Sequence, residues 1–329
     1  MREISYGDAI QEATLEEMRR DDRVYLIGYA VGRHAGSFAR PNEKLWAEFG
    51  EDRLIETGII EPCIGGSSVG AAVAGLRPVA DFQLVDFMFP ALNEVLGFGG
   101  MWRYEHGGGG ADGMTIPVVF RAGLRTYAGS AAEHTRAPIA VFWHQAGLKV
   151  VYPSTPYDAK GLMKTAIRDD NPVVYLEHTR LYQTKGPVPE EEYLIPFGQA
   201  SVKREGKDVT IVAIGYMVPM ALQAAEALEK EKISAEVVDP RTLEPLDIDT
   251  ILKSVQKTGR LVTVDEDYIR CGVGAEIAFQ VQKKLFKSLK APVERVGNLN
   301  TPHPCSPALW NVILPTPEKI AAAAKETMR

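Results

Sequence analysis

Short runs of β-branched and aliphatic residues alternate with segments of helical periodicity along almost the whole chain. In the first half, this pattern predicts strands at 23–28, 76–82, 117–121, 149–153 and 172–177. Helical patterns lie between them; one begins at Thr155, a residue that caps helices, followed by Pro156. Alternating strands and helices are typical of parallel sheets covered by helices. The sequence therefore predicts an α/β fold.

A composition change interrupts the alternation at 182–198, "YQTKGPVPEEEYLIPFG", which carries three prolines and three consecutive glutamates. Such a segment is typical of an exposed crossing between domains. A second alternation follows, with predicted strands at 208–215, 235–239, 260–265 and 291–297. We therefore expect two parallel-sheet α/β domains, residues 1–185 and 198–329, joined by a linker at 186–197.

Composition and charge exclude several classes of function. The chain has 329 residues, is 45% hydrophobic and carries a net charge of -6, with its Lys and Arg scattered. Neither a nucleic-acid partner nor a membrane surface is expected, because both require clustered basic residues. The three cysteines are far apart and lack metal-ligand spacing. With no apolar stretch of about 18 residues, a cytoplasmic location is expected.

The stretch from Glu56 to Phe82 permits two interpretations. "GSSVG" at 66–70 matches the G-x-S-x-G pattern, in which Ser68 would be the nucleophile of a hydrolase. That elbow requires an apolar strand running into the serine, whereas "EPCIGG" precedes it here. The second interpretation makes Glu61 the functional residue, an acid–base carboxyl at a strand-to-helix turn. The small residues after it would then allow a helix to pack closely.

Longer blocks point to a family. "TGIIE", "VGAAVAGLRPVADFQLVDF", "PSTPYDAKGL", "AIRDDNPV" and "GVGAEIA" occur in this order. The chain closely resembles the β subunits of thiamin-diphosphate-dependent 2-oxo-acid dehydrogenases, the decarboxylating components of pyruvate, branched-chain and acetoin dehydrogenase complexes. The resemblance runs essentially end to end. It implies a transketolase-like pyrimidine-binding domain followed by a transketolase C-terminal domain.

The resemblance also implies a site. Glu61 matches the glutamate that bonds the aminopyrimidine ring of the cofactor and promotes its imino tautomer. Phe87 matches the aromatic residue that packs on that ring, and Ile59 is placed in the same cofactor site. His134 matches the active-site histidine, and His144 a second recurrent histidine of less certain role.

The resemblance further implies metals and partners. Residues Val118, Ala166, Ile167, Asp169 and Asn171 match a segment that holds potassium in some members. The family's G-D-G motif for the metal that holds the diphosphate is missing here. The resemblance therefore implies that Mg²⁺ is held by an α subunit, in an α2β2 heterotetramer that acts on a small oxo substrate and passes the acyl unit to a lipoyl acyltransferase core.

Several positions depart from the family pattern. Tyr29-Ala30 replaces an acidic pair, "EHTR" at 133–136 replaces Q-H-S-Q, "NEV" at 93–95 replaces D-Q-I, and Gly107–Gly110 lengthen a loop. Either these changes repack loops, or the acyl donor is an acyloin, a diketone or another ketone. A different class of function stays open as well, a non-catalytic subunit that only assembles with its α partner.

Overall fold

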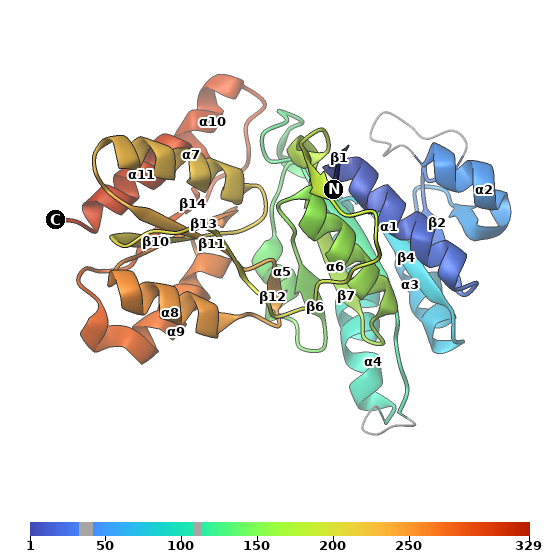
Figure 1. The fold of residues 1–329 in the computed structure, drawn as a ribbon. Helices are drawn as coiled ribbons and strands as arrows, with labels where there is room; N and C mark the ends of the chain where they lie inside the picture. The colour runs from blue at the N-terminus through green and yellow to red at the C-terminus, as the bar shows by residue number, and fades with distance from the viewer. Residues whose placement is uncertain (33–41, 108–112) are drawn as a thin grey trace. The chain divides into compact units, whose positions relative to one another are not determined.

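The computed structural model describes residues 1–32, 42–107 and 113–329. The chain forms two compact units (Figure 1). The first comprises Met1–Leu124 and Phe142–Phe197, and the second Arg125–Val141 and Gly198–Arg329. Each unit is built on a mostly parallel sheet, so the predicted α/β class is confirmed.

The main sheet of the first unit includes strands in the order β6-β7-β5-β4-β2-β3, all parallel, and β1 and β8 form a separate antiparallel pair. The elements of this unit are β1 (Arg2–Ser5), α1 (Tyr6–Arg20), β2 (Val24–Gly28), α2 (Glu43–Arg53), β3 (Leu54–Glu56), α3 (Glu61–Val73), β4 (Arg77–Leu84), a 3-10 turn (Val85–Met88), a π-helix (Asn93–Gly99), α4 (Gly100–Glu105), β5 (Val119–Leu124), β6 (Lys149–Val151), α6 (Pro156–Arg168), β7 (Val173–His178), a 3-10 turn (Thr179–Leu181) and β8 (Lys185–Val188). Every residue of β4 is buried, as expected for a strand inside a sheet covered on both faces.

The sheet of the second unit has the order β14-β13-β10-β11-β9, parallel except for β9. Its elements are a 3-10 turn (Ala132–His134), β9 (Ser201–Arg204), β10 (Val209–Ala213), α7 (Met217–Lys230), β11 (Ala235–Asp239), β12 (Thr242–Glu244), α8 (Ile248–Thr258), β13 (Leu261–Tyr268), α9 (Val273–Leu285), a 3-10 turn (Phe286–Ser288), β14 (Glu294–Asn298), α10 (Pro307–Ile313) and α11 (Pro317–Glu326), while α5 (Ile139–His144) spans the boundary between units.

Helix ends follow local signals in the sequence. The Thr155 side chain accepts a hydrogen bond from the Asp158 N–H and Pro156 opens α6, as the sequence predicts. Helix α8 ends at Gly259, whose φ of 76° is a conformation that glycine adopts without steric cost. Among the described helices, none is long and apolar enough to cross a membrane.

The organisation around two segments differs from the expected division. The expected linker at 186–197 clusters with the first unit, and its first residues belong to β8, which pairs with β1. The segment Arg125–Val141 clusters with the second unit although it precedes the composition change. Tyr127 explains this placement, because its ring lies in the apolar core of the second unit and its hydroxyl donates to the Pro315 carbonyl at 2.9 Å.

Candidate functional site

Two predicted site residues, Glu61 and Phe87, and Tyr29 of the pair that departs from the family pattern follow neighbouring strands of the first unit. Strand β2 pairs in parallel with both β3 and β4. Tyr29 follows β2, Glu61 follows β3 by a short turn, and Phe87 follows β4. Since the carboxyl ends of parallel strands meet at one edge of a sheet, these residues share the edge where α/β proteins usually bind ligands.

Glu61 is the first residue of α3. It is 9% exposed. Its carboxylate does not cap its own helix, and within the described parts of the chain it accepts no hydrogen bond and forms no ion pair. The helix N-terminus favours a negative charge at this position. The Glu61 oxygens are not among the buried side-chain atoms that lack a hydrogen-bond partner, so the carboxylate reaches solvent and is open to a donor from another molecule.

Phe87 is half-buried and forms an aromatic pair with Tyr29, with ring centroids 6.1 Å apart and planes inclined by 59°. The backbone around this pair is closely packed. A Cβ on Gly28 would lie 2.4 Å from the Asp81 carbonyl oxygen, so only glycine fits there. Gln83 has a φ of 63° and donates from its amide to the Tyr29 carbonyl at 3.1 Å. Tyr29 is thus part of the aromatic wall formed by Phe87, a role that the sequence alone did not indicate.

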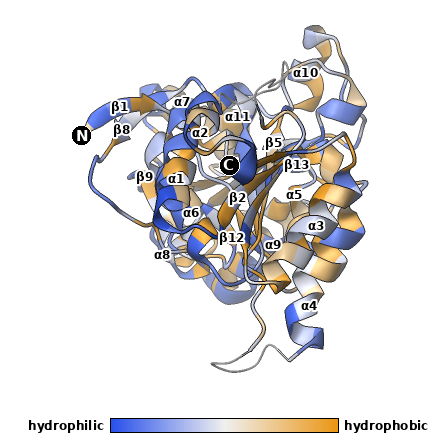
Figure 2. Cartoon of the chain, turned by 90° about the vertical axis from the view of Figure 1, so that its right-hand side faces the viewer, coloured by the Kyte–Doolittle hydropathy of each residue, from blue (hydrophilic) through white to orange (hydrophobic). Residues whose placement is uncertain are grey.

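Apolar surface adjoins Glu61. Ile59 is 72% exposed and Ile60 is 58% exposed. Val73, at the other end of α3, is 37% exposed. Helix α3 lies on the face of the first unit that Figure 2 turns to the viewer, where apolar residues are coloured orange. Exposed aliphatic residues beside a carboxylate without a partner in the described residues are typical of a surface that another molecule covers.

Ser68 lies inside α3, fully buried, and its hydroxyl donates to the Ile64 carbonyl at 2.7 Å. A nucleophile elbow would place it at a turn between strand and helix. The small residues of α3 serve packing instead, since a Cβ on Gly65 would lie 2.9 Å from the Cβ of Glu94 in the π-helix. The hydrolase interpretation of "GSSVG" is therefore wrong.

His134 belongs to the second unit, in the segment Arg125–Val141. It ends the 3-10 turn and is half-buried, with Nδ1 3.8 Å from the Glu133 carboxylate. Ala131, before that turn, has a φ of 63° and a ψ of 179°, a conformation costly for a residue with a Cβ. The Thr135 hydroxyl donates to the Ala131 carbonyl and closes the turn.

A row of buried acidic residues at the end of β13 fastens this segment, and the sequence analysis did not single it out. The Thr126 hydroxyl donates to the Glu266 carboxylate, and the Ala140 N–H donates to the Asp267 carboxylate at 2.7 Å. Burial and the neighbouring Asp267 raise the pKa of Asp265 to about 8. Three consecutive acidic residues, "DED", closing an apolar strand were the available signal.

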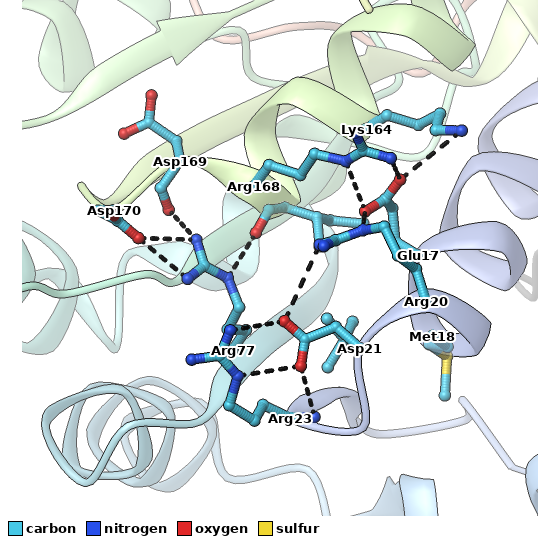
Figure 3. Close-up of polar contacts among 12 residues, drawn as sticks. Glu17, Met18, Arg20, Asp21, Arg23, Arg77, Lys164, Arg168, Asp169 and Asp170 are labelled. Carbon is cyan, nitrogen blue, oxygen red and sulfur yellow. Dashed lines mark hydrogen bonds and ion pairs between the residues drawn. The ribbon is translucent and has the colours of Figure 1, made fainter. Parts of the chain in front are cut away.

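The five residues matched to potassium lie around the C-terminal end of α6 and the strand β5. Arg77 already occupies part of this place, because its guanidinium donates to the Ile167 carbonyl at 2.9 Å and to the Asp169 carbonyl at 2.8 Å (Figure 3). Asp169 also accepts from Asn171, with 2.9 Å between the side-chain atoms. The positively charged Arg77 side chain therefore already contacts the carbonyls of two of the five residues. Potassium binding stays a prediction.

The same view shows an ionic cluster between α1 and α6. Glu17 is fully buried, and its carboxylate accepts from Arg20 at 2.6 Å and from Arg168 at 2.7 and 2.9 Å. Lys164 lies 3.7 Å from the same carboxylate. These contacts join the first helix to α6 and have no direct link to the sheet edge that carries Glu61.

The remaining predicted positions are distributed elsewhere. His144 ends α5 and is exposed. The "NEV" residues begin the π-helix, a type of turn that is rare and frequently found at functional sites. Of the glycine-rich loop, residues 108–110 lie outside the described residues. Within 1–32, 42–107 and 113–329, no group of three or more His, Cys, Asp or Glu is arranged to hold a metal ion.

Comparison with protein families gives two matches. The transketolase pyrimidine-binding domain matches residues 2–185, and the transketolase C-terminal domain matches residues 198–320. A solved structure described as a split-gene transketolase, an inactive β4 tetramer, has a TM-score of 0.77 with this chain at 23% identity. That likeness covers 99% of this chain and 98% of the other, and it shows the fold alone.

Curated relatives match over nearly the whole length. The acetoin:2,6-dichlorophenolindophenol oxidoreductase β subunit of Cupriavidus necator is 43% identical, over 100% of this chain and 98% of that protein. The 2-oxoisovalerate dehydrogenase β subunit of Bacillus subtilis is 41% identical, over 99% of both chains. The pyruvate dehydrogenase E1 component β subunit of Staphylococcus epidermidis is 42% identical, over 100% of this chain and 99% of that protein.

Proposed function

The chain belongs to the β subunits of the thiamin-diphosphate-dependent 2-oxo-acid dehydrogenase family, and on this premise we propose that it supplies the pyrimidine half of an active site shared with an α subunit. The observation that supports this proposal most is Glu61, a side chain only 9% exposed whose carboxylate accepts no hydrogen bond within the described parts of the chain and is open to a donor from another molecule. Its place beside exposed Ile59 and Ile60 fits a site completed at a subunit interface.

The residues present fit an aminopyrimidine ring. A carboxylate that needs a donor suits a ring nitrogen that carries a proton. The paired rings of Phe87 and Tyr29 provide an aromatic wall, and aromatic faces bind flat rings in offset or edge-to-face arrangements. Ile59, largely exposed at the same sheet edge, would add apolar contact once the partner covers it.

Each residue then has a distinct task. Thiamin diphosphate, when bound, supplies an acidic thiazolium carbon that adds to a carbonyl. Glu61 holds and exchanges a proton at its carboxylate, so it acts as the general acid–base group towards the pyrimidine. Phe87 orients that ring and excludes water from it. We assign His134 to the substrate, where its imidazole moves a proton on the oxo group.

The remaining components are proposed from the family. Mg²⁺ and the cofactor diphosphate would be held by the α subunit in an α2β2 heterotetramer in the cytoplasm, and a lipoyl acyltransferase core would accept the acyl unit. Potassium would use the carbonyls near the end of α6, shared with Arg77. We also propose that the pyrimidine-binding domain, residues 1–185, and the C-terminal domain, 198–329, are the functional divisions, joined at 186–197.

The decisive experiment compares cofactor binding by the chain alone and by the α/β pair. Calorimetry should show tight, magnesium-dependent binding of thiamin diphosphate to the pair and weak binding to the isolated chain. Tight binding by the isolated chain would contradict the division of the site. Exchange of the thiazolium proton in the pair separates an active enzyme from a non-catalytic assembly subunit, which would show none.

A second candidate substrate class is supported by the relatives. Proteins named for acetoin, 2-oxoisovalerate and pyruvate match at 43%, 41% and 42% identity, so identity does not select one of them. Acetoin is an acyloin, and Tyr29-Ala30 with Glu133 and Arg136 depart from the common residues near the substrate. We therefore propose an acyloin, a diketone or another ketone as the alternative acyl donor.

The test is the turnover of the reconstituted pair with an artificial electron acceptor. Pyruvate, 3-methyl-2-oxobutanoate and acetoin are compared at saturating cofactor. Turnover of either 2-oxo acid at roughly ten per second or more, ordinary for an enzyme, would refute the altered substrate and leave the 2-oxo-acid dehydrogenase assignment. Turnover confined to acetoin would establish the alternative.

A further inference from the structure

Three charged residues lie inside the sheet of the first unit, and the proposed mechanism does not use them. Arg121 of β5 is 3% exposed, and Asp81 of β4 and Glu177 of β7 are fully buried. The Arg121 guanidinium donates to the Glu177 carboxylate and lies 3.5 Å from the Asp81 carboxylate. Such a buried cluster adds little to stability, because apolar residues of similar size are often at least as favourable. A role other than stability is therefore expected for it.

The Asp81 carboxylate joins this cluster to a β-bulge at the end of β4. Asp81 pairs with Arg121 and Leu84 with Gly123, so β4 advances three residues where β5 advances two. Gln83 lies in this bulge, and its N–H donates to Asp81 Oδ1 at 2.7 Å, while Oδ2 faces Arg121. Bulges are frequent beside active sites, where they redirect a side chain.

The redirected side chain is that of Gln83, which is 3% exposed. Its φ of 63° is costly for a residue with a Cβ, whereas glycine would adopt it freely. The chain has glutamine here all the same, and the side-chain amide donates to the Tyr29 carbonyl at 3.1 Å. The left-handed backbone thus directs an amide from β4 to the residue that follows β2.

Tyr29 connects this amide to the aromatic wall. It directly follows Gly28, which pairs with Asp81 and has no room for a Cβ. The Tyr29 ring pairs with the Phe87 ring, with centroids 6.1 Å apart. Asp81, Gln83, Tyr29 and Phe87 therefore form an unbroken series of contacts from the buried ionic cluster to the sheet edge.

We propose that Gln83 is a positioning residue: held in the bulge by Asp81, it fixes the Tyr29 backbone, and the Tyr29 ring in turn orients Phe87. The contact of Phe87 with the cofactor pyrimidine comes from the proposed function, and the inference rests on it in that respect. The buried charges of Asp81 and Arg121 keep the bulge in place, which gives the ionic cluster its role.

The positions of the rings are tested on the isolated full-length chain without cofactor. Gln83→Met keeps the length of the side chain and removes the N–H donor. In NMR spectra of ¹³C-tyrosine-labelled protein, the Tyr29 ring signal, assigned with Tyr29→Phe, should shift in Gln83→Met in the same direction as in Phe87→Leu, because both changes separate the two rings. An unmoved Tyr29 signal in Gln83→Met would overturn the proposal. This measurement needs neither the α subunit nor thiamin diphosphate.

The effect on the site is tested by calorimetry on the reconstituted pair. Gln83→Met should weaken binding of thiamin diphosphate about three- to tenfold, the worth of one aromatic contact. The double variant with Phe87→Leu should bind no more weakly than the weaker single variant, because both changes remove the same contact. Losses that multiply, or wild-type affinity in Gln83→Met, would refute the proposal. Failure of the proposed function would appear instead as a wild-type pair that does not bind the cofactor.

Two further variants complete the test. Gln145→Met removes another amide that donates to a backbone carbonyl at 3.1 Å and should bind the cofactor like the wild type; an equal weakening there would refute a specific role for Gln83. Gln83→Gly decides if Gln83→Met does not fold, because glycine adopts the left-handed backbone without steric cost. It should show the same ring shift and the same weaker binding, and wild-type behaviour in both measurements would refute the need for the amide.

Discussion

Replacing Glu61 by glutamine should separate stability from activity. The carboxylate has no hydrogen-bond or ion-pair partner within the described parts of the chain, so glutamine leaves no protein group newly unpaired. The principal loss is the interaction of a negative charge with the start of α3, roughly 0.3–1 kcal/mol of unfolding free energy. A general acid–base group is worth about a hundredfold or more in rate, which is at least about 2.7 kcal/mol of transition-state stabilisation.

Two measurements on one preparation test this prediction. The free energy of unfolding of the isolated chain, measured in urea, should change by no more than about 1 kcal/mol. Exchange of the thiazolium proton in the reconstituted pair should fall about a hundredfold or more. Glu56→Gln, an exposed carboxylate five positions earlier, is the charge-matched control, and Ser68→Ala tests the hydrolase interpretation. Both controls should exchange normally. Normal exchange in Glu61→Gln, or turnover abolished by Ser68→Ala alone, would refute the reasoning.

Three further predictions concern single side chains of the first and second units. Because the pKa of Asp265 is raised to about 8, the folded chain keeps a proton that the unfolded chain loses; this contribution is complete below the unfolded pKa and is lost as pH rises through 8. The free energy of unfolding, measured in urea, should therefore fall by about 1.4 kcal/mol per pH unit between pH 6.5 and 7.5. Asp265→Asn should flatten that slope, and an equal slope in both proteins would contradict the raised pKa of Asp265. Glu17→Gln should cost roughly 3 kcal/mol because it removes the charge of a fully buried carboxylate that accepts from Arg20 and Arg168. Glu231→Gln, in an exposed pair with Lys325, should cost under about 1 kcal/mol; equal losses of unfolding free energy in urea would refute this difference. Phe87→Leu should weaken cofactor binding by the pair about three- to tenfold, the worth of one aromatic contact, and unchanged affinity by calorimetry would place the ring elsewhere.

The sequence by itself determined the fold class, the helix ends and the family. These properties depend on signals between residues close along the chain. Thr155 and Pro156 start α6, and Gly259 ends α8, because caps and left-handed turns involve residues a few positions apart. The position of Glu61 at the start of α3 was likewise predictable, because "TGIIE" and the small residues after it are contiguous.

Only the tertiary structure decided what each site residue touches. Thr126 bonds to Glu266 across 140 positions of sequence, and this pairing assigns the His134 segment to the second unit. Tyr29 meets Phe87 because β2 and β4 are neighbours in the sheet, which the period of either strand does not reveal. The absence of a partner for Glu61 within the described residues is likewise a property of all its surroundings. Such contacts depend on the order in which strands assemble, whereas propensities and caps act within a turn or two of the chain.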